Sequence, residues 1–255
     1  MLAQLLSAPS PALAHIAGIA SLDYRLSPYP DHPTDPSSPD DSSRNAVWPQ
    51  HLHDVRLALQ YLDDEYGVGS KYRWIGVGHS CGATLLAQLV AGMAPLPSEE
   101  TREGVEIARR GPSSLVLIAG IYDLRLMLSN HQPPSCPAHI AQIYKDFVQG
   151  AFGKDTSDAG FYDTVSPSHG AYVPEVCPSL KEVVLAYSPD DELIEPQQRE
   201  VMAARLMLCG WVERGQKGER VVEIMDLTDG HDEVWQDGRQ VAGLIGEAVG
   251  RMVGA

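Results

Sequence analysis

A serine placed between two glycines is the part of this chain best suited to chemistry. Residues 78–82 read Gly-His-Ser-Cys-Gly, after an apolar run and before an Ala/Leu-rich run. We interpret these two runs as a buried strand and a helix. We expect side chains at Gly78 and Gly82 to block the sharp turn between them, so both positions need glycine. The turn exposes the Ser80 hydroxyl to a base, while the helix start directs backbone N–H groups at an oxyanion. Gly-Ser-Gly clusters usually lie in polar loops, so the flanking runs favour the catalytic interpretation.

A serine hydroxyl is a weak nucleophile, so it needs a base, and the base needs an acid that orients it. In α/β-hydrolases the acid and then a histidine follow the serine along the chain, each in a loop after a strand. The chain has nine histidines, of which His169 and His231 lie well downstream of Ser80. Only His231 directly follows a further strand-like run. We therefore predict Ser80 as nucleophile and His231 as base, although a Gly-His-Asp loop can also be an ordinary exposed turn.

Three adjacent carboxylates follow the preceding strand-like run. They are Asp190, Asp191 and Glu192. In α/β-hydrolases, the loop that carries the acid resembles Gly-x-x-Asp-x-x-Val. This spacing puts Asp191 in the position of the acid and Ile194 in the position of the apolar residue that anchors the loop. We predict Asp191 as the acid, with Asp190 as the main alternative and Glu192 as a weaker one. A solvated acidic turn is also consistent with a net charge of −15.

Composition limits the remaining function classes. With 255 residues, 44% of them hydrophobic, the chain is long enough for one sizeable α/β domain and short for two. Its charge of −15 argues against nucleic acid and anionic membranes as partners. Four widely spaced cysteines without a Cys-x-x-Cys pair favour free thiols. Residues 1–22 lack Lys and Arg, and no apolar run reaches the length of a membrane span, so we expect a cytoplasmic protein.

We expect no metal and no cofactor. His51 and His53 lie two residues apart on a predicted helix and therefore point to different sides. The pair Asp31-His32 lies in a proline-rich loop. Cys81 is not expected to be a nucleophile, because the turn exposes the central Ser80. We predict instead that the Cys81 backbone N–H is an oxyanion donor.

Strand-like runs alternate with helical runs along the chain. The strand-like runs before and after residues 78–82 cover 16–24, 114–120, 182–187 and 221–227, and the main helical runs cover 45–67, 197–208 and 241–252. This alternation predicts a mostly parallel sheet with helices on both faces, in a single domain spanning 1–255. Residues 125–175 break the rhythm with aromatics, prolines and short helical pieces. We predict a cap-like insertion there, above the strand ends where ligands bind in such sheets.

Several segments occur in an order that resembles the fungal kynurenine formamidases. In sequence these segments are Asp-Tyr-Arg-Leu-Ser-Pro at 23–28, a helix at 48–62, Gly-His-Ser-Cys-Gly-Ala at 78–83, Gly-Ile-Tyr-Asp-Leu at 120–124, Ala-Phe-Gly at 151–153, Ser-Pro at 166–167 and Gly-His at 230–231. The first and third segments are shared with many esterases. The series from 120 to 167 is more discriminating, and the resemblance spans roughly residues 10–250.

The resemblance implies an α/β-hydrolase that converts N-formyl-L-kynurenine to L-kynurenine and formate in tryptophan degradation, with a serine triad and no cofactor. Because the formyl group is small, selectivity is expected to come from the amine side of this small-molecule substrate. Four aromatic residues are candidates for that role: Tyr122, Tyr144, Phe147 and Phe152. A carboxylesterase acting on small acyl esters is the alternative enzyme. A homodimer is a further expectation.

One departure from the family is large. The family carries a His-Gly-Gly-x-Trp motif upstream of Asp-Tyr-Arg-Leu-Ser-Pro, and the backbone of that motif supplies most of the oxyanion hole. This chain contains no His-Gly-Gly, and Asp23 is already near its start. We therefore expect an N-terminally truncated form of the fold without a central strand, and weak turnover. The alternative to an enzyme is an inactive truncated product.

Overall fold

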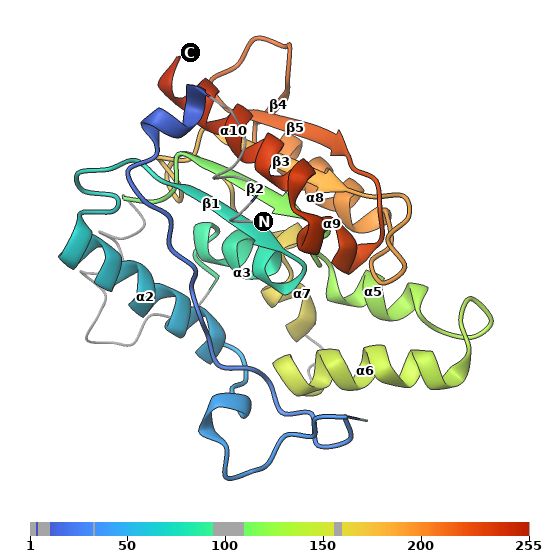
Figure 1. The fold of residues 1–255 in the computed structure, drawn as a ribbon. Coiled ribbons are helices and arrows are strands. Elements are labelled where there is room, and N and C mark those ends of the chain that lie inside the picture. Colours follow the sequence, from blue (N-terminus) through green and yellow to red (C-terminus); the bar gives the residue numbers. More distant parts are fainter. Residues whose placement is uncertain (1–3, 5–10, 33, 94–109, 156–159, 255) are drawn as a thin grey trace.

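The fold is built on a parallel sheet. The computed structural model describes residues 4, 11–32, 34–93, 110–155 and 160–254. In this part of the chain the sheet has five strands in the order β1-β2-β3-β5-β4, and every pair is parallel (Figure 1). The strands are β1 (Ile75–His79), β2 (Ser114–Ile118), β3 (Glu182–Tyr187), β4 (Val212–Glu213) and β5 (Val221–Asp226).

Helices separate the strands along the chain, except that β5 follows β4 with no helix between them. Their bounds are α2 (Gln50–Tyr66), α3 (Cys81–Val90), α5 (Leu124–Asn130), α6 (Ala138–Phe152), α7 (Phe161–Val165), α8 (Gln197–Leu208), α9 (His231–Asp237) and α10 (Arg239–Val253). Short 3-10 helices are η1 (Pro11–His15), η2 (Ser42–Arg44) and η3 (Pro167–His169). The predicted helices and the four predicted strands from β1 onward are thus present, whereas the two-residue strand β4 was not anticipated.

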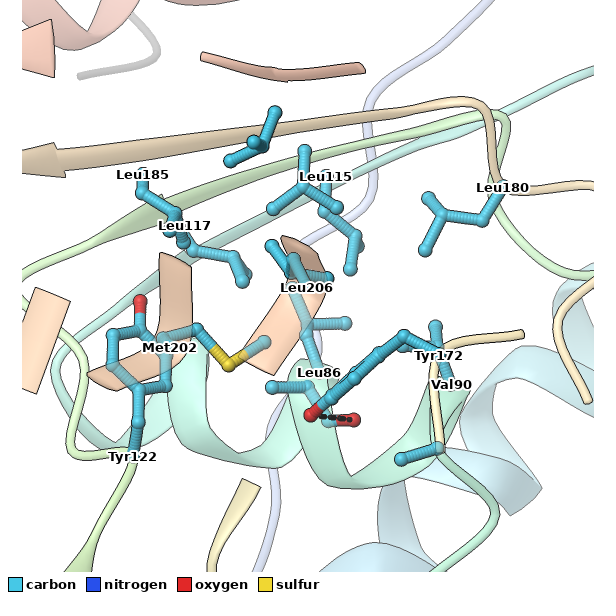
Figure 2. Close-up of a cluster of buried hydrophobic side chains, with 14 of the residues drawn as sticks. Leu86, Val90, Leu115, Leu117, Tyr122, Tyr172, Leu180, Leu185, Met202 and Leu206 are labelled. Atoms are coloured by element: carbon cyan, nitrogen blue, oxygen red, sulfur yellow. Dashed lines mark hydrogen bonds between the residues drawn. The ribbon is translucent and has the colours of Figure 1, made fainter. Parts of the chain in front are cut away.

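Strand β2 shows how the helices cover both faces of the sheet. All five of its side chains are buried, as expected for a parallel strand enclosed on both sides. Leu115 and Leu117 pack into a cluster with side chains of α3 and α8 (Figure 2). Val116 and Ile118 point the other way, into a cluster formed largely by α10. The apolar core therefore has two halves, one on each face of the sheet.

Residues 16–24 do not form the predicted strand. Strand β1 lies at the edge of the sheet, and β2 is its only partner among the described residues. Ile19 in the predicted strand is 46% exposed. An apolar run becomes a strand only where a neighbour completes its backbone hydrogen bonds, and no described strand pairs with this segment. The prediction from the apolar pattern was therefore wrong for these residues.

Side chains hold the end of this segment on helix α2. Arg25 Nε and Nη2 donate to the two carboxylate oxygens of Asp54 at 2.8 and 2.7 Å. Ser27 Oγ and His51 Nε2 are 2.9 Å apart. The Asp-Tyr-Arg-Leu-Ser-Pro motif therefore anchors a loop to α2 through polar contacts. Burial of the His51 ring lowers its pKa, so the neutral ring is favoured at this contact.

Helices α5 to α7 lie in the region predicted as an insertion. Helix α6 reaches the loop after β3, where Tyr144 Oη donates to the Leu193 carbonyl at 2.7 Å. That loop follows the carboxyl end of β3, so α6 is positioned at the edge of the sheet where ligands bind in open α/β folds. The prediction that residues 125–175 form a cap-like insertion stays a prediction.

Candidate active site

The turn after β1 has the backbone strain expected of an exposed nucleophile. Ser80 has φ 52° and ψ −123°, a conformation that L residues rarely adopt. Its N–H donates to the Ile118 carbonyl at 2.9 Å, which fixes the turn to the end of β2. Helix α3 begins at the next residue. The sequence therefore forms the strand, strained serine and helix that its pattern predicts.

Only one of the two glycines around Ser80 is required by close packing. A Cβ on Gly78 would lie 2.6 Å from the Ala83 nitrogen and from the Gly82 carbonyl. A Cβ on Gly82 would have no described atom within 4 Å. The close approach of the helix start to the strand therefore depends on Gly78. The expectation that both glycines prevent a clash was wrong for Gly82.

We expect Gly78→Ala to lower the free energy of unfolding by about 1–3 kcal/mol, because the added methyl group overpacks the turn. Gly82→Ala is the matched control, since position 82 is helical and open, and Ala is about 1 kcal/mol better than Gly in a helix. Thermal or urea unfolding of both variants measures the difference. Equal destabilisation by the two substitutions would contradict this account.

The structure brings Asp191 and His231 together. Asp191 Oδ2 and His231 Nδ1 are 2.8 Å apart, and their side chains are 1% and 4% exposed. Asp190, the main alternative acid, is exposed on the same loop. Since Asp191 accepts from Nδ1–H, the neutral ring has Nε2 as its basic nitrogen, as a general base for serine requires.

Asp191 is held as a carboxylate by several donors. Its Oδ1 accepts from the backbone N–H groups of Leu193 and Ile194 at 2.9 and 2.8 Å. Burial acts to raise the pKa of Asp191, but the hydrogen bonds from His231 and from these two N–H groups outweigh it and hold that pKa below its usual range. The loop thus places a buried carboxylate at hydrogen-bond distance from the His231 ring.

His231 also contacts the residue before Ser80. It is the first residue of α9, after the short connection that follows β5, and its carbonyl oxygen lies 3.0 Å from His79 Nε2. The two imidazole rings are 4.5 Å apart between centroids. The base loop is therefore fastened to the turn that carries Ser80. The role of His79 was not anticipated from the sequence, because it is a contact across 152 positions.

The surroundings of Cys81 suit its backbone N–H for a role at the site better than its thiol. As the first residue of α3, it has an N–H without an acceptor one turn earlier in the helix. Burial of the thiol raises the pKa of Cys81, opposed by a hydrogen bond with Ser80. A thiol with a raised pKa is a poor nucleophile at neutral pH. The geometry therefore suits Cys81 to donate its N–H to an oxyanion beside Ser80.

The four aromatic candidates for substrate binding lie in different surroundings. Tyr122 is 2% exposed and belongs to the core cluster shown in Figure 2, so its ring is enclosed by protein. Gly120 permits this, since a Cβ there would lie 2.5 Å from the Tyr122 hydroxyl. Phe147 is 41% exposed on α6. Tyr144 and Phe152 pack partly buried against one apolar cluster. The prediction for Tyr122 as a pocket residue therefore does not fit this conformation.

The cluster that includes Tyr144 and Phe152 extends to the loop after β3 and to the start of α3. It contains Ile194 of the acid loop and is contacted by Cys81 and Trp48. The Trp48 ring meets the Phe161 ring edge to face at 5.6 Å. Burial and the nearby Glu195 carboxylate raise the pKa of Tyr144 to about 12, so its hydroxyl remains a neutral donor to the acid loop. Trp48 and Phe161 were not predicted as candidates from the sequence, because their contact joins distant parts of the chain and no local pattern indicates it.

The sheet order, the strained serine between β1 and α3, and the Asp–His pair after β3 and β5 define an α/β-hydrolase. Solved structures agree with this fold. An acetyl ester-xyloside bifunctional hydrolase from Caldicellulosiruptor lactoaceticus superposes with a TM-score of 0.54 at 15% identity, covering 82% of this chain and 68% of that one. An esterase/lipase from an uncultured bacterium gives 0.51 at 17% identity, covering 82% and 62%.

Curated relatives identify the family. Kynurenine formamidase-like hydrolase fscH of Fusarium equiseti is 34% identical over 92% of this chain and 70% of its own length. Kynurenine formamidase avaC of Aspergillus versicolor is 33% identical over 88% and 72%, and a kynurenine formamidase of Meyerozyma guilliermondii is 29% identical over 90% and 71%. The chain belongs to the kynurenine formamidase family. No protein-family profile matches it.

Three further observations concern only the described residues. No helix among them is both long enough and apolar enough to cross a bilayer. No three His, Cys, Asp or Glu side chains among them gather in a way that could hold a metal ion. All four cysteines, Cys81, Cys136, Cys177 and Cys209, are free thiols.

Proposed function

We propose that this chain hydrolyses N-formyl-L-kynurenine with Ser80 as nucleophile, His231 as base and Asp191 as acid. The observation that carries the proposal is the buried 2.8 Å contact between Asp191 and His231, in a loop fastened to the strained turn at Ser80. Membership of the kynurenine formamidase family supports the choice of an aryl formamide as substrate. The homodimer and the cytoplasmic location remain predictions from the sequence.

The reaction divides into acylation and deacylation. Ser80 Oγ attacks the formyl carbon while its proton passes to His231 Nε2, and the Cys81 N–H donates to the oxyanion. Asp191 stabilises the resulting imidazolium. As the tetrahedral intermediate collapses, the C–N bond breaks and His231 protonates the departing aryl amine. His231 then takes a proton from water, which attacks the formyl ester and releases formate, and Ser80 recovers its proton.

Recognition of the amine side is assigned to the apolar cluster beside the acid loop. Tyr144 and Phe152 retain the role predicted for them, and Trp48 and Phe161 join them from the loop before α2 and from α7. Aromatic side chains suit this role because they present flat apolar surfaces to an aryl ring. The mechanism needs no metal or cofactor, since the triad and backbone N–H groups supply all proton transfers and charge stabilisation it uses.

A carboxylesterase remains the second candidate, because the structures that share the fold include an esterase/lipase. We expect kcat/KM for an aryl formamide to exceed that for the matching aryl acetate by at least about tenfold, equivalent to ~1.4 kcal/mol of transition-state stabilisation. Parallel assays with the two substrates, and with Ser80→Ala as a blank, measure this ratio. A preference for the acetate would assign the chain to the esterases while leaving the triad intact.

A further inference from the structure

His231 is held by its backbone as well as by its ring. Its N–H donates to Glu192 Oε2 at 3.0 Å, and its carbonyl oxygen lies 3.0 Å from His79 Nε2. The ring is held separately through Nδ1 by Asp191. Three side chains therefore fix one residue at three points. The backbone contacts come from the acid loop on one side and from the nucleophile turn on the other.

We propose that Glu192 and His79 are positioning residues, which hold the backbone of His231 so that its ring Nε2 stays aligned with Ser80. This inference rests on the proposed role of His231 as the base. Neither side chain is assigned a contact with substrate. Their effect is geometric, and it matters because a displacement of about 1 Å at a catalytic group can cost roughly 10²-fold in rate.

Glu192 reaches the start of α9 because position 230 is a glycine. A Cβ on Gly230 would lie 2.9 Å from Glu192 Oε2 and still closer to the Glu233 carboxylate. The hydrogen bond from the His231 N–H holds the pKa of Glu192 below its usual range, so the acceptor is a carboxylate at neutral pH. Because Asp191 and Glu192 are consecutive, one loop contacts both the ring and the backbone N–H of His231.

His79 contacts the His231 backbone from the turn that carries Ser80. The centroid of its ring lies 4.5 Å from that of the His231 ring, and the Trp235 ring is stacked on it at 5.5 Å. Burial, and then the charge of the nearby His231 ring, lower the pKa of His79, while its hydrogen bond to the His231 backbone and the Asp191 and Asp232 carboxylates act in the opposite direction. A neutral His79 has one N–H, and the His231 carbonyl is the acceptor that places this proton on Nε2. Since His79 precedes Ser80, movement of the turn and movement of the base are linked.

The test compares substitutions that remove or keep each contact. Glu192→Ala removes the acceptor, whereas Glu192→Gln keeps an amide oxygen that can accept from the His231 N–H. His79→Phe keeps the ring stack and removes the donor, whereas His79→Gln restores an N–H donor. Glu233→Gln is the matched control. Glu233 is an exposed acid in the first turn of α9, the helix that begins at His231, and its carboxylate accepts no hydrogen bond from the backbone of the described residues.

We expect Glu192→Ala and His79→Phe each to lower kcat by about 10–10²-fold with KM nearly unchanged, and the Gln variants to recover most of that loss. The rate constant for fluorophosphonate labelling of Ser80 should fall in parallel, which tests positioning even if the substrate assignment fails. Glu233→Gln should behave like the unaltered chain. Thermal unfolding in each case separates loss of fold from loss of alignment.

A second readout requires no reactivity. The Nδ1 proton of His231 should give a downfield ¹H resonance from its hydrogen bond to Asp191, and Glu192→Ala should shift or broaden it, whereas Glu233→Gln should not. Unchanged labelling rates together with an unchanged resonance in Glu192→Ala would overturn the inference. Failure of aryl formamide turnover with the labelling differences retained would instead overturn only the proposed substrate.

Discussion

Ser80→Ala is expected to abolish covalent labelling by a fluorophosphonate and to lower kcat for an aryl formamide by roughly 10⁴–10⁶-fold. The strained backbone at Ser80 places this residue directly before α3 and next to His79, whose ring contacts the His231 carbonyl. Alanine leaves the oxyanion donor and the apolar cluster in place but removes the atom that forms the acyl intermediate. Labelling followed by mass spectrometry and steady-state kinetics measure both effects.

The matched control for this experiment is Ser129→Ala, which removes an exposed serine on α5 whose hydroxyl bonds only locally, to Leu126. That variant should be labelled like the unaltered chain. Labelling that persists in Ser80→Ala would place the nucleophile elsewhere. The first residue to test would then be Cys81, despite the raised pKa of its thiol.

Local sequence patterns predicted the helices and strands whose formation depends mainly on their own apolar pattern. Strand β3 and helix α8 have the predicted bounds, Glu182–Tyr187 and Gln197–Leu208. Strand β3 is a short apolar run buried by neighbours on both sides, and α8 has an apolar face that packs on the sheet. Residues 16–24 show the limit of this reasoning. Their apolar pattern resembles that of β3, but a strand also needs a partner, which lies outside the local sequence.

In the candidate site, too, some residues could be predicted from the sequence and others could not. Ser80 and His231 follow from motif and chain order, and the choice of Asp191 over Asp190 follows from the spacing of the acid loop. The contacts of His79 and Glu192 with His231 do not follow, because they join residues 152 and 39 positions apart through the ends of different strands. Tyr122 was misplaced because its short motif does not reveal that Gly120 lets the ring fold into the core.

Asp191→Asn is expected to lower kcat by about 10⁴-fold, whereas Asp190→Asn should change it less than about twofold. The amide oxygen that replaces Oδ1 of Asp191 can still accept from the Leu193 and Ile194 N–H groups, so the loop keeps its shape. The new amide nitrogen would face His231 Nδ1 as a donor, which favours the tautomer with the proton on Nε2 and removes the basic nitrogen from Ser80. Asp190 is exposed and serves as the matched control, since its substitution removes the same charge from the same loop.

The depressed pKa of Asp191 adds a pH signature to the same pair of variants. A carboxylate whose pKa is lower in the folded than in the unfolded chain stabilises the fold above its unfolded pKa of about 3.9, and this contribution is lost as the pH falls through the folded value. The thermal stability of the unaltered chain and of Asp190→Asn should therefore fall more steeply below about pH 4 than that of Asp191→Asn, which has no carboxyl group to protonate there. Equal kinetic losses in the two variants, or a larger loss and a flatter acid profile in Asp190→Asn, would transfer the role of acid to Asp190.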